Sequence, residues 1–465
     1  MNRLVIAVGA TVGLVIGAGQ LAAQADEYRD PACEMDQGHY LVKNATTYLK
    51  GATEEADPAN REQLLIDAYR NLVEAINGDQ AENPAVWYFL GRYYVMRNDG
   101  FGADSAFARV ETVLPECQPD IDYYRQTVYV RAVNNGIDSL QNFANDGAKG
   151  EFRNAGAVWK SSNVPAFYLA SVFGEEGEID SALHYFSEVA KIGEADTAHV
   201  DNYHTAIENI AILYQMLEDW DSTVVWYKKT RELDPTNNEA LLGIAEAYSY
   251  MGDAENAALF YDSVLAKSTE MSDLDLMNAG VKLFNSNEFD RAAQAFEAGL
   301  AKNPNHRDGL FNLANTYLAI ADDQGRPEAE RNDALRKMDA ITHRLIRVDP
   351  QSREAYRILA AAHQMQGMED STAAIMDEVD ALDFEVVVDL ARPESGTYLV
   401  AGRVNNLRER QITFGTVTFE FLDATGTVVA TGTVPGEALA AEGSKRFTFR
   451  QTEPNIVAWQ YRIGS

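Results

Sequence analysis

Small and aromatic residues recur along the chain at a spacing that suits paired helices. The first clear copy consists of Gly91, Tyr94, Ala103, Phe107 and Pro115, with steps of three, nine, four and eight residues. Apolar positions three and four residues apart lie on one face of a helix, so the pattern predicts amphipathic helices. The proline predicts where the second helix of the pair ends and a connection begins.

The same spacing returns several times. The small residues Ala211, Ala245, Gly280 and Ala314 are separated by 34, 35 and 34 positions. Weaker copies begin at Ala170 and Ala360. This period, with these residue types, resembles the tetratricopeptide (TPR) repeat, a pair of antiparallel helices. The resemblance implies a mainly α fold, a TPR α-solenoid in which stacked pairs supply a shared core, with partners held in a concave groove.

Each position of the repeat has a physical reason. A Gly or Ala lets two helices approach closely, and the aromatic residues fill the space around it. Gly252 falls where the turn between the two helices requires a residue that accepts positive φ.

The pattern has three departures. Residues 38–78 predict a divergent first pair, with Ala68, Leu72 and Ala75 on its inner face. The spacing fails over residues 118–162, where an irregular helical pair is expected. Residues 322–331 predict an insertion that lengthens one repeat by about a turn or more.

After residue 383 the helical pattern gives way to period-two, β-branched runs, which predict a small antiparallel β-sandwich over residues 384–465. The run FEFLDATGTVVATGTV, in which Phe419, Leu422 and Asp423 carry the match, resembles the FxLyD type of domain of exported bacterial proteins. We expect Phe419 and Phe421 to pack in the core and Asp423 to cap a hairpin turn.

The first 25 residues predict an export signal. Arg3 precedes an apolar run from Leu4 to Ala18, and Ala23-Gln24-Ala25 has the form of a cleavage site. An uncleaved membrane anchor is the alternative, but the run is shorter than the roughly 20 residues that cross a bilayer. We therefore expect a periplasmic or extracellular protein with no membrane insertion after cleavage. The array would then occupy residues 26–383.

Export changes the interpretation of the two cysteines. In an oxidising compartment Cys33 and Cys117 are expected to pair, whereas the alternative is two buried, unreactive thiols. A disulfide would attach the N-terminal segment to the end of the first clear repeat.

The chain is strongly acidic, with 39 Lys+Arg against 71 Asp+Glu and a net charge of −32. This balance argues against nucleic-acid binding, which relies on cations that neutralise phosphates. Residues 26–384 hold 62 acidic and 30 basic side chains, so the repeats carry nearly all of the negative charge and produce nearly all of the electrostatic field. The field favours a cationic or polyamine-like partner, and an acidic surface that serves only solubility is the competing explanation.

No catalytic or cofactor motif is present. The sequence has no H-E-x-x-H, G-x-S-x-G, P-loop or dinucleotide fingerprint. His199 and His204 are five residues apart, which places them on different faces of a helix. The stretch from Asn98 to Asp104 has the acidity of a calcium loop without its ligand spacing, and a turn is expected there. We expect no enzyme, metal or cofactor.

The predicted function is therefore a non-catalytic scaffold that binds a protein or peptide in an acidic concave groove. Asparagine suits such a groove because its amide both donates and accepts hydrogen bonds. The alternatives are a cell-envelope assembly factor that organises several partners and an enzyme with an unrecognised site. The predicted groove residues lie on the first helix of each pair: Tyr88, Arg92, Phe167, Glu208, Glu246, Asn278, Asn312 and Asn315.

Overall fold

The computed structural model describes residues 28–194, 200–394 and 396–464, and the predicted signal segment lies outside them. The chain divides into two compact units, with the boundary between Pro235 and Thr236. The division falls within the helical part, between two successive helix pairs.

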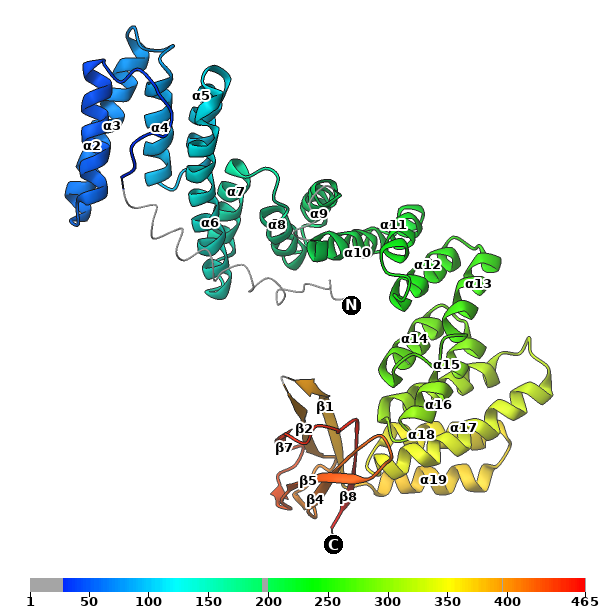
Figure 1. Cartoon of the computed structure of the whole chain (residues 1–465). Helices are drawn as coiled ribbons and strands as arrows, with labels where there is room; N and C mark the ends of the chain where they lie inside the picture. The colour runs from blue at the N-terminus through cyan, green and yellow to red at the C-terminus, as the bar shows by residue number, and fades with distance from the viewer. Residues whose placement is uncertain (1–27, 195–199, 395, 465) are drawn as a thin grey trace. The chain divides into compact units, whose positions relative to one another are not determined.

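Unit 1 consists of consecutive helices that pack as antiparallel pairs (Figure 1). Its helices are α2 (Tyr40–Glu54), α3 (Pro58–Asn77), α4 (Pro84–Met96), α5 (Gly100–Val113), α6 (Gln118–Gln141), α7 (Asn145–Val158), α8 (Val164–Glu175), α9 (Ile179–Gly193), α10 (Val200–Met216) and α11 (Trp220–Leu233).

Unit 2 continues with the same arrangement and then changes to strands. Its helices are α12 (Asn238–Tyr250), α13 (Ala254–Leu265), α14 (Asp273–Asn285), α15 (Phe289–Lys302), α16 (Arg307–Asp322), α17 (Glu328–Val348), α18 (Arg353–Met365) and α19 (Glu369–Ala381). The fold is thus mainly α, with TPR-type helix pairs followed by small antiparallel sheets, as the sequence predicts.

In most of the pairs a small residue contacts an aromatic residue sixteen positions later. A Cβ at Gly91 would lie 2.4 Å from the Phe107 ring, and one at Gly280 would lie 2.5 Å from the Phe296 ring. Ala211 is fully buried and takes the same position. Because a larger side chain would collide with the ring, the small residue fixes how closely the two helices pack.

The pair over residues 118–162 is more regular than the sequence suggests. Gly136 and Phe152 have the same separation of sixteen residues, and a Cβ on Gly136 would lie 2.6 Å from the Phe152 ring. The irregularity lies in α6, which has 24 residues, against 13 in α4. The repeat contact therefore persists, and the first helix is extended ahead of it.

The other two departures occur as expected. Ala68, Leu72 and Ala75 are buried on α3. The insertion lengthens α17 to 21 residues, against 14 in α15. Arg326 lies in the connection before α17 and binds both carboxylate oxygens of Asp290 at 3.0 and 2.8 Å, which attaches the insertion to α15.

The turn inside a repeat takes a left-handed residue. Gly252 has φ +76°, as predicted, and the equivalent turn residue Asn287 has φ +61°. Asparagine tolerates this conformation better than most side chains, so the turn survives without glycine.

The strands form two three-stranded antiparallel sheets with one shared core. In the first sheet β2 (Thr397–Asn406) lies between β1 (Phe384–Glu394) and β7 (Ser444–Gln451). In the second, β4 (Val417–Leu422) lies between β5 (Val428–Val434) and β8 (Ala458–Ile463). Two short strands, β3 (Ile412–Thr413) and β6 (Ala438–Leu439), pair separately.

The residues singled out in this region have the expected local roles. Phe419 and Phe421 are fully buried. Asp423 accepts hydrogen bonds from the amides of Thr425 and Thr427, at 2.9 and 3.0 Å, and so caps the β4–β5 turn. The Thr425 hydroxyl, together with these amides, lowers the pKa of Asp423.

We predict opposite effects of alanine at two glycines of the α6–α7 pair. Gly136→Ala should lower the free energy of unfolding by about 1–3 kcal/mol, because the methyl group meets Phe152. That ring is fully buried and stacks on Tyr168 with centroids 4.7 Å apart, so it has little room to move. Denaturant unfolding measures the loss.

Gly150→Ala is the matched control, because nothing lies within 4 Å of its Cβ position on α7. It should raise the free energy of unfolding by about 0.5–1 kcal/mol, as alanine favours the helix. Equal destabilisation by both changes would contradict the packing argument.

Candidate functional site

A cavity of about 800 Å³ opens on unit 2 between the first helices of two successive pairs, α14 and α16. Its lining is mostly apolar with a few amides, and Asp322 is its one charged member. The lining residues are Val281, Phe284, Asn285, Phe296, Phe311, Asn312, Asn315, Leu318, Ala319 and Asp322.

The lining follows the repeat. Val281 and Asn315 are 34 residues apart, as are Phe284 and Leu318. Equivalent positions of neighbouring first helices therefore face the same space. Stacking pairs with one geometry produces a surface whose chemistry changes at each step while its backbone spacing stays constant.

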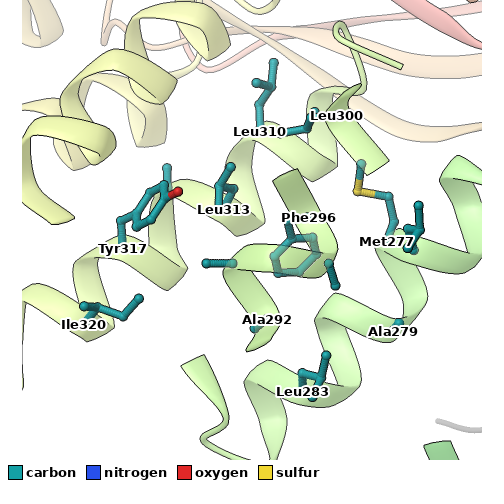
Figure 2. Close-up of a cluster of buried hydrophobic side chains, with 14 of the residues drawn as sticks. Met277, Ala279, Leu283, Ala292, Phe296, Leu300, Leu310, Leu313, Tyr317 and Ile320 are labelled. Atoms are coloured by element: carbon teal, nitrogen blue, oxygen red, sulfur yellow. The ribbon is translucent and has the colours of Figure 1, made fainter. Parts of the chain in front are cut away.

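The floor of the cavity belongs to the core. Figure 2 shows Phe296 of α15 among Met277 and Leu283 of α14 and Leu313 of α16. Phe296 is fully buried and also lines the cavity. The ring that sets the approach of α14 and α15 thus supports the surface above it, so the cavity is rigid at its base.

Two predicted groove residues, Asn312 and Asn315, lie together in this cavity. Both are half-buried, and the Asn315 Nδ2 donates a hydrogen bond of 3.0 Å to the Phe311 carbonyl in its own helix. The apolar partners Val281, Phe284 and Leu318 were not among the predicted groove residues. Applying the 34-residue period to the positions around the asparagines would have found them.

The remaining predicted residues of unit 2 lie on the preceding first helices. Asn278 is exposed on α14, one repeat before Asn312, but it does not line the cavity. Glu246 is half-buried on α12, at the position equivalent to Asn315. Its negative charge is among the minor causes that raise the pKa of Tyr261 to about 12, and burial is the main one.

In unit 1 three of the predicted residues offer no open surface. Phe167 is 5% exposed and packs edge-on against Phe186. Tyr88 is fully buried and donates a hydrogen bond to Asp120. Arg92 is 5% exposed and donates a hydrogen bond of 2.7 Å to the Arg29 carbonyl. The expectation of accessible side chains is wrong for these three. Phe167 and Tyr88 belong to the hydrophobic core, whereas Arg92 contacts the segment that contains Tyr28 and Arg29.

The last predicted groove residue, Glu208, is half-buried on α10. It lies in unit 1 and is not part of the cavity between α14 and α16.

The two cysteines lie next to each other, and Cys33 is joined to Cys117 with a Cα–Cα distance of 5.1 Å. Cys117 ends a 3₁₀ turn (Pro115–Cys117) just before α6. The bond attaches residues 28–36 to the helical core of unit 1.

Within unit 2 a buried polar group joins the helices to the sheets. The Tyr461 hydroxyl of β8 donates a 2.6 Å hydrogen bond to Asp349, which follows α17. Arg307 donates to the other oxygen of Asp349 at 3.0 Å. Burial raises the pKa of Asp349, against the opposing effects of Arg307 and Tyr461. This group fixes the sheets to α16 and α17.

Other chemistry is sparse. In the ranges that the structure describes, no three His, Cys, Asp or Glu side chains cluster as metal ligands do. The ring of His204 is tilted against that of Tyr203, with centroids 5.9 Å apart, and His199 lies outside the described residues. Asn98 and Asp99 form the expected turn, in which Asp99 caps α5. A search of the described helices for one long and apolar enough to span a membrane finds none.

Comparison with known proteins gives distant matches, and no protein family model matches the chain. The CTR9 homolog of Arabidopsis thaliana is 24% identical over 214 residues, which is 43% of this chain. The chain spans 18% of that protein's length.

Among solved structures, a tetratricopeptide repeat protein from Parabacteroides merdae superposes with a TM-score of 0.36 at 14% identity, covering 55% of this chain and 93% of that one. Yeast Tom70 gives a TM-score of 0.32 at 13% identity, covering 78% and 65% respectively.

We predict that Tyr461→Phe lowers the free energy of unfolding of unit 2 by about 1.5–3 kcal/mol, because Asp349 loses a hydrogen bond made by a charged acceptor. Denaturant unfolding is the measurement. Tyr398→Phe is the matched control: Tyr398 is buried in the same β core without a hydrogen bond among the described residues, and should change stability by less than about 0.5 kcal/mol. Equal changes in the free energy of unfolding for the two variants would show that Tyr461 stabilises unit 2 through the packing of its ring and not through its hydrogen bond.

Proposed function

We propose that the protein is a non-catalytic scaffold that binds an extended, cationic segment of another protein in the groove of unit 2. The single observation that carries this proposal is the cavity between α14 and α16, in which apolar side chains lie beside three asparagines, Asn285, Asn312 and Asn315. Asparagine amides can bond a peptide main chain without selecting its side chains, while the apolar positions bury some of them.

The preference for a cationic segment follows from charge. Asp322 is the one charged residue among those that line the cavity. The helical part as a whole carries 62 acidic and 30 basic side chains. Such a field speeds the encounter with cationic partners and weakens as salt increases.

The proposal includes location and the role of the sheets. Export to an oxidising compartment is supported by the apolar N-terminal run and by the disulfide. The C-terminal sheets, which we assign to an FxLyD-like domain on the sequence resemblance, cover the end of the array. The Arg408 guanidinium donates a hydrogen bond of 2.6 Å to the Asp380 carbonyl of α19, the second helix of the last pair, which supports this covering role.

The test is a selection of short random peptides on the purified full chain. We expect selected peptides to be rich in Lys or Arg and to bind more weakly as salt rises. The variant Asn312→Ala/Asn315→Ala should bind them about tenfold more weakly, since each lost amide contact costs about 0.5–1.5 kcal/mol. Fluorescence titration measures the affinities.

Leu259→Ala is the control for this experiment. Leu259 is 61% exposed on α13, the second helix of its pair, and does not line the cavity. Its replacement should leave binding unchanged. Selection of acidic peptides, or equal binding by the double-asparagine variant, would contradict the proposed groove.

A second function, a cell-envelope assembly factor, is favoured by the division into two compact units. Each unit contains its own first-helix surface, so one chain could hold two partners. Crosslinking mass spectrometry with an envelope extract should then find different proteins attached to the two units. Attachment of one protein at a fixed stoichiometry would argue for the simple scaffold.

A further inference from the structure

Residues 28–36 run without regular secondary structure beside the first helices α4 and α6 of unit 1. Two buried charged side chains bind their main chain. Arg92 of α4 donates to the Arg29 carbonyl at 2.7 Å, and Asp120 of α6 accepts from the Ala32 amide at 3.4 Å. Each of these two charged side chains is 5% exposed. Contacts of this kind recognise an extended chain by its backbone.

Two side chains of the segment add specific contacts. The Arg92 guanidinium lies 4.4 Å from the centre of the Tyr28 ring, and the Arg29 guanidinium lies 4.1 Å from the Tyr123 ring. Cation–π pairs at these distances are attractive, and more so where water is excluded. The aromatic residue of the segment, Tyr28, thus pairs with a cation of the groove, Arg92. The next residue of the segment, Arg29, is a cation and pairs with an aromatic residue of the groove, Tyr123.

The segment is held at two further points. The Asn83 Nδ2 donates to the Asp36 carbonyl at 3.1 Å, next to the start of α4. The Cys33–Cys117 bond closes a loop across a sequence separation of 84 residues. The non-covalent contacts position the segment, and the disulfide prevents it from leaving.

The segment binds like a ligand more than like a core element. Five of its nine residues are exposed, namely Arg29, Asp30, Ala32, Glu34 and Asp36. Arg92 has no carboxylate partner among the described residues and uses the Arg29 carbonyl instead. If the segment left, the groove would present an unpaired cation, an acceptor at Asp120 and open aromatic rings.

We propose that residues 28–36 are a built-in occupant of a peptide-binding groove on α4 and α6, retained by the Cys33–Cys117 disulfide. Reduction by a dithiol converts the disulfide to two thiols, and the dithiol is oxidised to its own disulfide, so two electrons and two protons are transferred. The freed segment then exchanges with another extended polypeptide that has an aromatic residue followed by a cation.

This groove is independent of the cavity on unit 2. If the proposal for the groove on α4 and α6 fails, the peptide-binding proposal for the cavity between α14 and α16 still stands. Failure of the cavity proposal likewise leaves the groove proposal standing, because the variants that test the two lie on different units.

The first experiment measures hydrogen exchange of the full chain with and without dithiothreitol. We expect the Ala32 amide and its neighbours to exchange about tenfold faster, or more, after reduction, while helices α12–α16 stay unchanged. Cys33→Ser/Cys117→Ser should reproduce the reduced state without reductant. Unchanged protection, or loss of helical circular dichroism on reduction, would overturn the proposal, because the segment would then be a structural part of unit 1.

The second experiment measures binding in trans. The chain carries Cys33→Ser/Cys117→Ser together with Tyr28→Gly and Arg29→Gly, which weaken its own occupant. The probe is a fluorescent peptide with the sequence of residues 26–37 and serine in place of its cysteine. We expect saturable binding below about 1 mM, the effective concentration of a short tether. No saturation would overturn the proposal.

Two arginine substitutions, each added to the chain with the four substitutions above, test where the peptide binds. Arg92→Ala should weaken the peptide by about tenfold or more, since a buried charged donor is lost. Arg109→Ala should have no effect, because Arg109 is exposed on α5, where its guanidinium lies 4.2 Å from the Trp87 ring. Equal binding by both variants would overturn the assignment of the groove.

Discussion

The contact between a small residue and an aromatic ring sixteen positions later is the constraint on which most of the helix pairs depend. At Gly280 there is no room for even a methyl group beside Phe296. A close approach of this kind fixes the distance and angle of two helices at once, because the ring fills the whole gap. Repeating the contact repeats the geometry, and stacked pairs bury faces that a single pair would leave exposed.

The functional surfaces follow from the same contact. Once neighbouring pairs have equal geometry, equivalent positions of their first helices face a common space. Phe284 and Leu318 show this at a distance of 34 residues in the chain. The scaffold therefore separates two tasks: small and aromatic residues determine the shape, and the positions beside them determine the chemistry. The change from Val281 to the equivalent Asn315 alters the chemistry of the surface from apolar to polar at the same position of the repeat.

The sequence predicted the repeat contacts because they are local and periodic. It found Asn312 and Asn315, which lie in the cavity, by the same periodicity. It missed the Gly136–Phe152 contact because Ser139 stands where an aromatic residue was expected and Lys160 stands in place of the proline. The three matching positions of the five, Gly136, Ala148 and Phe152, were too few to recognise, although the contact between Gly136 and Phe152 sets the packing of the pair.

The 34-residue period could not predict contacts between the repeats and the non-repeating parts of the chain. Tyr88 and Arg92 were placed on the groove side of α4, but nothing in their spacing indicated that Tyr88 would bond to Asp120 or that residues 28–36 would lie over Arg92. That contact joins segments far apart in the chain and has no period. The same holds for Tyr461 and Asp349, which are 112 residues apart and meet through one hydrogen bond. Such pairs depend on where the repeats bring the ends of the chain.

The polar groups of the two units imply different modes of binding. In unit 1 the groove side holds a buried cation and a buried carboxylate, Arg92 and Asp120, and both bond to a main chain that the protein itself provides. Buried charges are costly without partners, so this surface is more stable when it is occupied. The cavity of unit 2 relies on neutral amides and apolar side chains, which tolerate water. It can therefore stay open until a partner arrives, whereas the groove of unit 1 favours the bound state of its own segment or of another polypeptide.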